Sequence, residues 1–233
     1  DLALGRRAGE VMNIHAARAP ERYRGVRPLV AADPHGVLDP WPNPPFDLME
    51  QAAFREGARA LSDRGLVLDL WVFHHQLDQV TALARVLPDL VIVLDHIGTP
   101  LGMGYYEGRR AAVFAAWRAS LAKLADCPNV VVKLGGLNMH FNGFGWNDRS
   151  SPPTSDELVS ANRDYYLAAI ELFGPHRCLF ESNFPMDKRA CSYEVLWNAH
   201  KKMVRDFSAA EKALMFEGVA RRVYGLGAGS SVP

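Results

Sequence analysis

The sequence contains 233 residues, of which 48% are hydrophobic. A chain of this size and composition can bury a large core, which excludes a disordered protein and a small disulfide-held scaffold. Lys plus Arg and Asp plus Glu each number 26, so the formal charge is zero, and the chain has no strong field with which to attract nucleic acid or an anionic membrane.

The apolar runs and the cysteines point to a protein without membrane spans or disulfides. Runs such as Leu66–Phe73 and Leu90–Leu94 fall far short of the roughly 20 residues that a spanning helix needs. Cys127, Cys178 and Cys191 are odd in number and form no Cys-x-x-Cys pair, which fits a reducing compartment. We therefore expect a cytoplasmic protein with neither a nucleic-acid nor a membrane partner.

Short apolar runs rich in β-forming residues alternate with longer helical patterns, which is typical of βαβ units around a parallel sheet. A helical pattern opens the chain, before the first strand. The five expected strands are Gly25–Val30, Leu66–Phe73, Leu90–Asp95, Val130–Leu134 and Cys178–Phe180. Each of them is followed by a polar or glycine-rich segment, so the sequence predicts an α/β fold.

Helix boundaries are predicted from capping residues and apolar stripes. Asp47 and Glu50 have the spacing of a capping box that would open a helix over Leu48–Asp63, and Gly65 follows as its C-terminal cap. Other helix starts are expected at Glu107, Ser155 and Ser208, the last with Glu211 at capping-box spacing. Two buried helix stripes are expected, one at Val113, Trp117, Leu121 and Leu124 and another at Leu167, Ile170 and Phe173.

The segment 137–153 shows no hydrophobic period and contains four turn-forming glycines and prolines, so it is predicted to be a long functional loop over the strand ends. The sequence shows no internal repeat and no linker that would divide the chain. We expect one domain over residues 1–226 and a disordered tail over residues 227–233.

Polar side chains gather where the expected strands end. They are His74, Gln76, Asp95, His96, Lys133, Asn183 and Asp187. Because ligands of parallel β/α proteins bind at the carboxyl ends of the strands, this segregation predicts a shared polar pocket. Alternation along a strand would place Asp95 and His96 on opposite faces, with His96 facing inward and Asp95 acting as a cap or a supporting carboxylate.

A structural interpretation stands beside each functional one. His74 and His96, taken singly, are as readily hydrogen-bonded structural residues as catalytic ones. Lys133 lies in an apolar run, where a charge needs a partner or a ligand, unless the strand is an edge strand whose ammonium reaches water. The sequence has no zinc-type His or Cys spacing, no P-loop, no dinucleotide fingerprint and no Gly-x-Ser-x-Gly, which disfavours those enzyme classes.

Four ordered segments resemble a known family. They are Leu68–Leu77, Val91–Gly98, Val130–Leu137 and Phe180–Pro185. Together they resemble the amidohydrolase-related (amidohydrolase 2) family of the metal-dependent hydrolase superfamily, and within it the lactonase-like branch. The resemblance runs from Arg24 to Tyr224. It implies a TIM (β/α)8 barrel in which the five strands are the fourth to the eighth, with an N-terminal part that carries three strands and a His-x-His pair missing from this sequence.

One position departs from the family pattern. The resemblance implies an aspartate that activates water or binds metal at the position of Asn183, but a carboxamide cannot take a proton from water at neutral pH. Since the His-x-His pair is absent too, no metal and no other cofactor is expected. Glu181, which would share a strand face with Asn183, or Asp187 could supply the missing carboxylate.

The leading hypothesis is metal-independent hydrolysis of a lactone or a related carbonyl compound, a small-molecule substrate. His96, with His74, would polarise the carbonyl or carry protons, Lys133 and Arg27 would stabilise a carboxylate or an oxyanion, and Asn183 would orient water. Further candidate substrate-binding residues are Gln76, Glu181 and Asp187.

Two alternatives stay open. One is non-oxidative decarboxylation of a small carboxylic acid, which relatives usually perform with a metal. The other is a catalytically silent barrel that binds a carboxylate or serves as an interaction subunit. An open five-stranded sheet would also expose unpaired edges, which favours a homo-oligomer.

Overall fold

The computed structural model describes residues 1–41 and 43–227. Its centre is a single parallel sheet of five strands in the order β1-β2-β3-β4-β5. The strands are β1 (Gly25–Val26), β2 (Val67–Leu70), β3 (Ile92–Leu94), β4 (Val130–Leu134) and β5 (Cys178–Phe180). Strands that are consecutive in the chain are neighbours in the sheet, as in the wall of a (β/α) barrel. Of the predicted tail, residues 228–233 lie outside the described residues.

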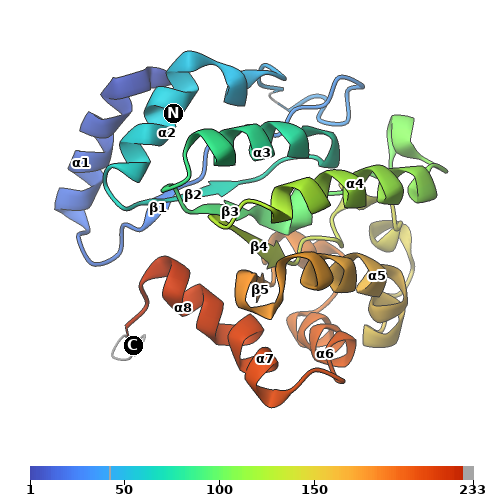
Figure 1. The fold of residues 1–233 in the computed structure, drawn as a ribbon. Coiled ribbons are helices and arrows are strands. Elements are labelled where there is room, and N and C mark those ends of the chain that lie inside the picture. The colour runs from blue at the N-terminus through green and yellow to red at the C-terminus, as the bar shows by residue number, and fades with distance from the viewer. Residues whose placement is uncertain (42, 228–233) are drawn as a thin grey trace.

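Helices connect the strands and cover the sheet (Figure 1). They are α1 (Ala8–Arg18), α2 (Ala52–Ser62), α3 (Leu77–Val86), α4 (Arg110–Ala125), α5 (Ser155–Phe173), α6 (Tyr193–Met203), α7 (Ala209–Ala213) and α8 (Val219–Tyr224). A π-helical turn over Leu214–Gly218 joins α7 to α8. None of the helices within the described residues is long and apolar enough to span a membrane.

The predicted strands are found, although the first three are shorter than expected. Beyond β1, an isolated bridge between Leu29 and Trp71 continues the pairing with β2. The last two strands have the predicted bounds. The apolar stripe on α4 is buried as predicted, and Ser208 forms the expected capping box with Glu211.

Two predicted helix starts are wrong. A 3-10 turn over Leu48–Glu50 precedes α2, and the extended residue Gln51 separates the two. Asp47 has φ −90° and ψ 12° and caps nothing, because an N-terminal cap needs an extended backbone there. Its carboxylate accepts a hydrogen bond from the Gln51 side chain instead. Glu107 starts no helix because Gly108 follows in a left-handed conformation (φ 71°), and α4 begins at Arg110.

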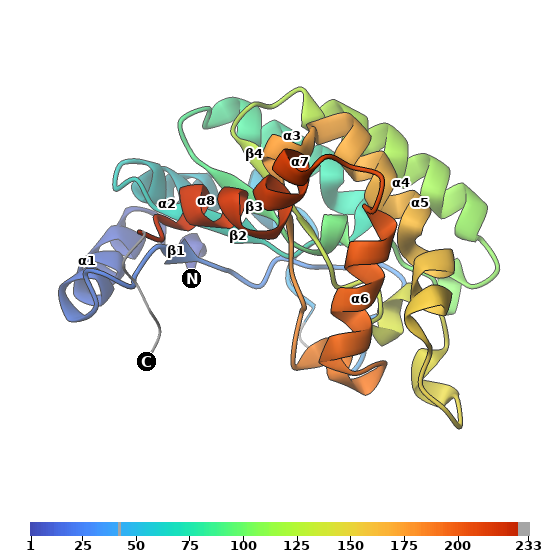
Figure 2. The same ribbon diagram turned by 90° about the horizontal axis from the view of Figure 1, so that it is seen from below.

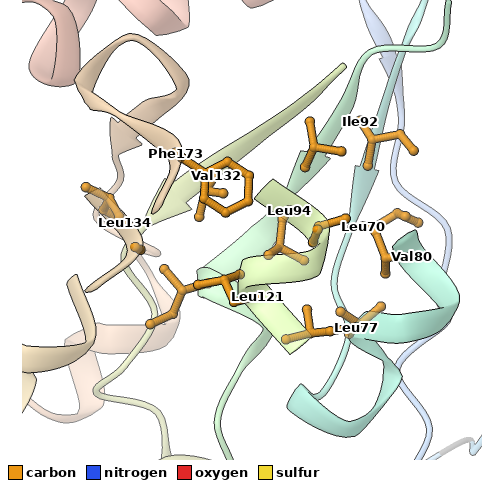
Figure 3. Close-up of a cluster of buried hydrophobic side chains, with 14 of the residues drawn as sticks. Leu70, Leu77, Val80, Ile92, Leu94, Leu121, Val132, Leu134 and Phe173 are labelled. Atoms are coloured by element: carbon orange, nitrogen blue, oxygen red, sulfur yellow. The ribbon is translucent and has the colours of Figure 1, made fainter. Parts of the chain in front are cut away.

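Alternate residues of each strand face opposite sides of the sheet. One face packs against the helices and forms the main core, in which side chains of β2, β3 and β4 meet those of α3 and α4 (Figure 3). Its labelled members are Leu70, Leu77, Val80, Ile92, Leu94, Leu121, Val132, Leu134 and Phe173. Because side-chain direction alternates along each strand, the residues between these core positions point to the opposite face of the sheet.

The opposite face, here called the inner face, combines apolar and charged groups. Val131 and Leu179 pack there with Val219 of α8, and α8, which lies below the sheet in Figure 1, is in front of it in Figure 2, where the molecule is seen from below. Asp69 and Lys133 also point to this side, since Lys133 is two residues beyond Val131 and forms an ion pair with Asp69. Two charged residues are thus placed between strands whose other face is wholly apolar.

Candidate functional site

The ammonium group of Lys133 joins two carboxylates of neighbouring strands. Its Nζ lies 2.5 Å from Oδ1 of Asp69 and 2.8 Å from Oδ1 of Asp95. Tyr224 of α8 donates a 2.7 Å hydrogen bond from its hydroxyl to the same oxygen of Asp69. Burial opposes the charged form of Lys133, but Asp95, Asp69 and Glu181 outweigh it and raise the pKa of the ammonium. Lys133 is therefore held as a cation inside a network of carboxylates.

The imidazole of His96 lies between a carboxylate and a guanidinium. Its Nδ1 is hydrogen-bonded to Oε1 of Glu181, and Nη2 of Arg27 lies 3.3 Å from its Nε2. A guanidinium has no acceptor atom, so Nε2 must be the acceptor, and the proton of a neutral imidazole is on Nδ1, donated to Glu181. Although burial opposes it, His96, Lys133 and Arg27 hold the pKa of Glu181 below its ordinary value, which keeps the accepting carboxylate ionised.

Arg27 connects the two parts of this cluster. Its Nε lies 2.9 Å from Oδ2 of Asp95, while the other oxygen of Asp95 faces Lys133. The Asp95 side chain is fully buried, whereas 48% of the Arg27 side chain is exposed. Arg27 therefore contacts the buried cluster while about half of its side chain is open to solvent.

The prediction that Asp95 and His96 point to opposite faces is wrong. The strand alternation stops at Leu94, and the chain enters a left-handed turn in which His96 has φ 53°, Ile97 φ 49° and Thr99 φ 34°. This turn brings both side chains into one cluster. Because such a conformation costs about 1 to 2 kcal/mol per non-glycine residue, the surrounding contacts must stabilise it.

Gly136 makes room for the imidazole. It follows β4 with φ 70°, and a Cβ atom added there would lie 2.5 Å from Cγ of His96. The diglycine after Lys133 thus has a defined steric role, because any larger residue at position 136 would displace the His96 ring.

Asn183 and Asp187 form a second group of polar side chains. Nδ2 of Asn183 donates a 2.9 Å hydrogen bond to Oδ1 of Asp187, and Nδ2 of Asn138 donates to the other oxygen at 3.3 Å. Asn162 in turn donates to Oδ1 of Asn138. Burial raises the pKa of Asp187 to about 6, although the hydrogen bonds from Asn183 and Asn138 lower it. One N–H of the Asn183 amide is thereby engaged, and Oδ1 is the atom of this side chain that can accept a hydrogen bond from water.

A cavity of about 400 Å³ is lined in part by Asn138, one member of this second group. Met103, Met139 and Phe141 form apolar parts of its wall, and Asn138 and Arg189 add polar groups. The lining residues come from the loops that follow β1, β3, β4 and β5, including the long loop predicted over 137–153. A small ring compound therefore has space beside Asn138, which contacts Asp187.

Two predicted site residues have other partners. Oε1 of Gln76 accepts from the backbone of Ala32 and Phe73, and its Nε2 donates to Val30, so its amide fastens the loop after β1 to the loop after β2. His74 lies next to His75 and Tyr106, where burial lowers its pKa to about 4. Gln76 and His74 therefore contribute to the packing of the loops around the site, and the partners named here do not include His96.

Sequence reasoning missed two members of the Lys133 network, Asp69 and Tyr224. Asp69 is the single charged residue in the run Val67–Leu70, as Lys133 is in its own strand. Asp69 and Lys133 have opposite charges, and each interrupts an apolar strand, so the sequence contained evidence for an ion pair between them. Tyr224 carried no such signal, because its contact spans 155 positions of the chain.

The described residues do not fit a metal ion. They include no group of three or more His, Cys, Asp or Glu side chains that could hold one. The carboxylates that come closest to such a group, Asp95 and Glu181, already face Arg27, Lys133 and His96, and a cation needs negative ligands that are not neutralised.

Comparison with known proteins identifies the family. Residues 9–226 match the Amidohydro_2 profile, which is described as amidohydrolase. The chain belongs to the amidohydrolase family. This finding confirms the lactonase-like resemblance at the level of the family, and the five parallel β/α units agree with the TIM-barrel fold of its structural neighbours.

Curated relatives of this amidohydrolase include an uncharacterised protein y4mH of Sinorhizobium fredii, 32% identical over 93% of the chain and 65% of the relative. An L-fucono-1,5-lactonase of Burkholderia multivorans is 32% identical over 76% of the chain and 57% of the relative. The chain thus spans less than two thirds of the length of these relatives.

Solved structures of amidohydrolases are similar to this chain. An amidohydrolase from Burkholderia multivorans with bound HEPES superposes with a TM-score of 0.76 at 28% identity, covering 93% of this chain and 70% of that one. A second structure of an amidohydrolase from that organism, with bound zinc, has a TM-score of 0.73 at 28% identity and covers 91% of this chain and 69% of that one. A Pseudomonas putida protein described as a putative 2-pyrone-4,6-dicarboxylic acid hydrolase, at 20% identity and a TM-score of 0.61, shares the fold, covering 92% of this chain and 67% of that one.

The raised pKa of Asp187 leads to a stability prediction. Between its ordinary value of 3.8 and about 6, the folded protein binds a proton that the unfolded chain releases. This contribution to stability is therefore fully present below pH 4 and is lost as the pH rises through 6. We expect the stability of the wild type relative to Asp187→Asn to fall by about 3 kcal/mol over this window, measured by urea unfolding at successive pH values. A difference between the two proteins that does not change with pH would contradict this assignment.

Proposed function

We propose that this amidohydrolase hydrolyses a cyclic ester, with His96 as the general base. The observation that carries the proposal is the imidazole of His96 held between Glu181 and Arg27, with Nε2 left as a lone-pair acceptor. A carboxylate that fixes the tautomer of an imidazole and stabilises its protonated form is the arrangement that general-base catalysis uses. The relatives named as L-fucono-1,5-lactonases support a lactone as substrate.

The reaction follows from these atoms. Nε2 of His96 takes a proton from water as the oxygen attacks the lactone carbonyl carbon, and Glu181 stabilises the imidazolium. The oxyanion of the tetrahedral intermediate collapses, the bond from the carbonyl carbon to the ring oxygen breaks, and the imidazolium returns its proton to that oxygen. The product is the open hydroxy acid. Asn183 supports the attack by accepting a hydrogen bond from the water through its Oδ1.

Arg27 has two roles in this scheme. Its guanidinium covers Nε2 before the substrate binds, and its half-exposed donors can turn to the oxyanion or to a carboxylate of the substrate. Lys133, whose ammonium is committed to Asp69 and Asp95, acts as a fixed positive charge that keeps Asp95 and Arg27 in place. His74 and Gln76 contribute by holding the loops around the cavity.

The setting proposed for this activity is a cytoplasmic enzyme that acts on a small molecule. The three cysteines are free and buried, which fits a reducing compartment. Within the described residues β1 pairs only with β2, and β5 only with β4, so the sheet has two edges through which copies of the chain could associate. Analytical ultracentrifugation would test this association.

The first prediction concerns His96. His96→Asn removes the base while keeping a polar side chain, and we expect kcat for lactone hydrolysis to fall by about 100-fold or more. Glu181→Gln should lower kcat less, because this substitution keeps the imidazole of His96 and removes only the carboxylate beside it. His176→Asn is a control, since His176 is exposed on the turn before β5. The rate is measured in a pH-stat, and a wild-type rate for His96→Asn would remove this residue from the mechanism.

The second prediction concerns Arg27. Loss of a charge-assisted hydrogen bond costs about 1.5 to 3 kcal/mol, so Arg27→Met should lower kcat/KM for a carboxylate-bearing lactone by about 10-fold to 100-fold. If Arg27 binds a substrate carboxylate, the loss for a neutral lactone of the same ring size should be several-fold smaller. Equal losses for both substrates would assign Arg27 to the oxyanion alone.

The third prediction concerns metals. Because the carboxylates of the site are neutralised by side-chain cations, dialysis against a strong chelator should leave the hydrolysis rate unchanged. Metal analysis of the dialysed protein would verify that the treatment worked. A loss of activity that zinc restores would show that the reaction depends on a metal and would overturn this part of the proposal.

A further inference from the structure

We infer that Trp117 is a positioning residue for catalysis, because its indole holds the left-handed turn that presents His96. The inference rests on the proposed role of His96 as the general base. Trp117 lies on α4, on the side of the sheet opposite to the inner face. Its indole makes no hydrogen bond to the side chains of Arg27, His96 or Glu181. Its influence would pass through the backbone of residues 96–99.

The turn is unfavourable by itself. Four consecutive residues, 96–99, have positive φ, and three of them are not glycine. Ile97 and Thr99 are β-branched, the side-chain type that tolerates this conformation least. Such a segment persists only where its surroundings determine it, so the contacts that hold it are the place to look for control of His96.

Two indoles hold the turn. Nε1 of Trp117 donates a 2.7 Å hydrogen bond to the carbonyl of Ile97, the residue that follows His96. Nε1 of Trp71 donates a 3.1 Å hydrogen bond to Oγ1 of Thr99. Within the turn, the amide of Thr99 bonds to the carbonyl of His96 at 2.9 Å. Each of the three bonds fixes a different atom group of the turn, and together they set the direction of the His96 side chain.

Trp117 is itself rigid. The whole residue is buried, and its ring contacts those of Phe114 and Tyr165, with ring centroids 5.5 Å and 5.1 Å away. A donor on such a ring cannot follow a carbonyl that moves. Removal of the N–H group leaves a buried carbonyl without its partner and lets the turn relax, and even a small displacement of a general base lowers the catalytic rate strongly.

The experiment compares indole with phenyl at two positions. Trp117→Phe keeps an aromatic ring but loses the donor, and we expect kcat to fall about 10-fold while KM changes less than about twofold. Trp197→Phe is the matched control, because Nε1 of Trp197 is buried and has no hydrogen-bond partner among the described residues. The control should keep the wild-type kcat, and circular dichroism should show that both variants are folded.

A rescue distinguishes positioning from general loss of structure. Glycine adopts left-handed backbone without strain, so Trp117→Phe should cost less activity in an Ile97→Gly background than in the wild type. If Trp117→Phe does not fold, Trp71→Phe removes the second bond from a partly exposed ring and should lower kcat in the same way. Wild-type kcat for every indole variant that folds, together with an inactive His96→Asn, would overturn this inference alone, whereas an active His96→Asn would overturn the proposed function.

Discussion

The candidate site depends on the ion pairs that one ammonium group makes inside the sheet. Lys133 joins Asp69 of β2 to Asp95 at the end of β3, and Asp95 passes the connection to Arg27 at the end of β1. Buried pairs of this kind add little net stability, because the charges lose their hydration, but removal of one partner leaves an unpaired charge and costs about 3 to 5 kcal/mol. The network therefore acts by fixing positions: four neighbouring strands cannot shift in register without breaking it.

The charge balance of the cluster suits the proposed chemistry. Asp69, Asp95 and Glu181 provide three carboxylates, and Arg27 and Lys133 provide two permanent cations. One negative charge remains, and it lies next to His96 through Glu181. A proton taken up by the imidazole during water attack offsets this charge within the cluster. This is the sense in which a fixed electrostatic environment favours a transition state over the ground state.

Much of this arrangement could be predicted from the sequence, because it follows from short-range patterns. The apolar run Val130–Leu134, with one charge at Lys133, indicated both the strand and its unusual side chain. The convergence of Arg27, His96, Lys133 and Glu181 followed from the rule that parallel strands end at one edge of a sheet. The direction of Asp95 could not be predicted, because strand alternation ends where the left-handed turn begins, and three non-glycine residues with positive φ are not signalled by residue type. The hydrogen bonds of Gln76 and Asn183 could not be predicted either, because the paths of the loops determine their partners.

The C-terminal helix has a consequence for how the protein is made. Tyr224 donates to Asp69, and its carbonyl accepts from Arg24 beside β1, so the end of α8 is bonded to β2 and to the residue before β1. During synthesis from the N-terminus, Arg24 and Asp69 emerge from the ribosome 200 and 155 residues before Tyr224. The nascent chain therefore carries Asp69 and Lys133 without their tyrosine partner until Tyr224 has been made, and a chain that stops before Tyr224 would assemble its outer helices yet lack the tyrosine that closes the charged interior.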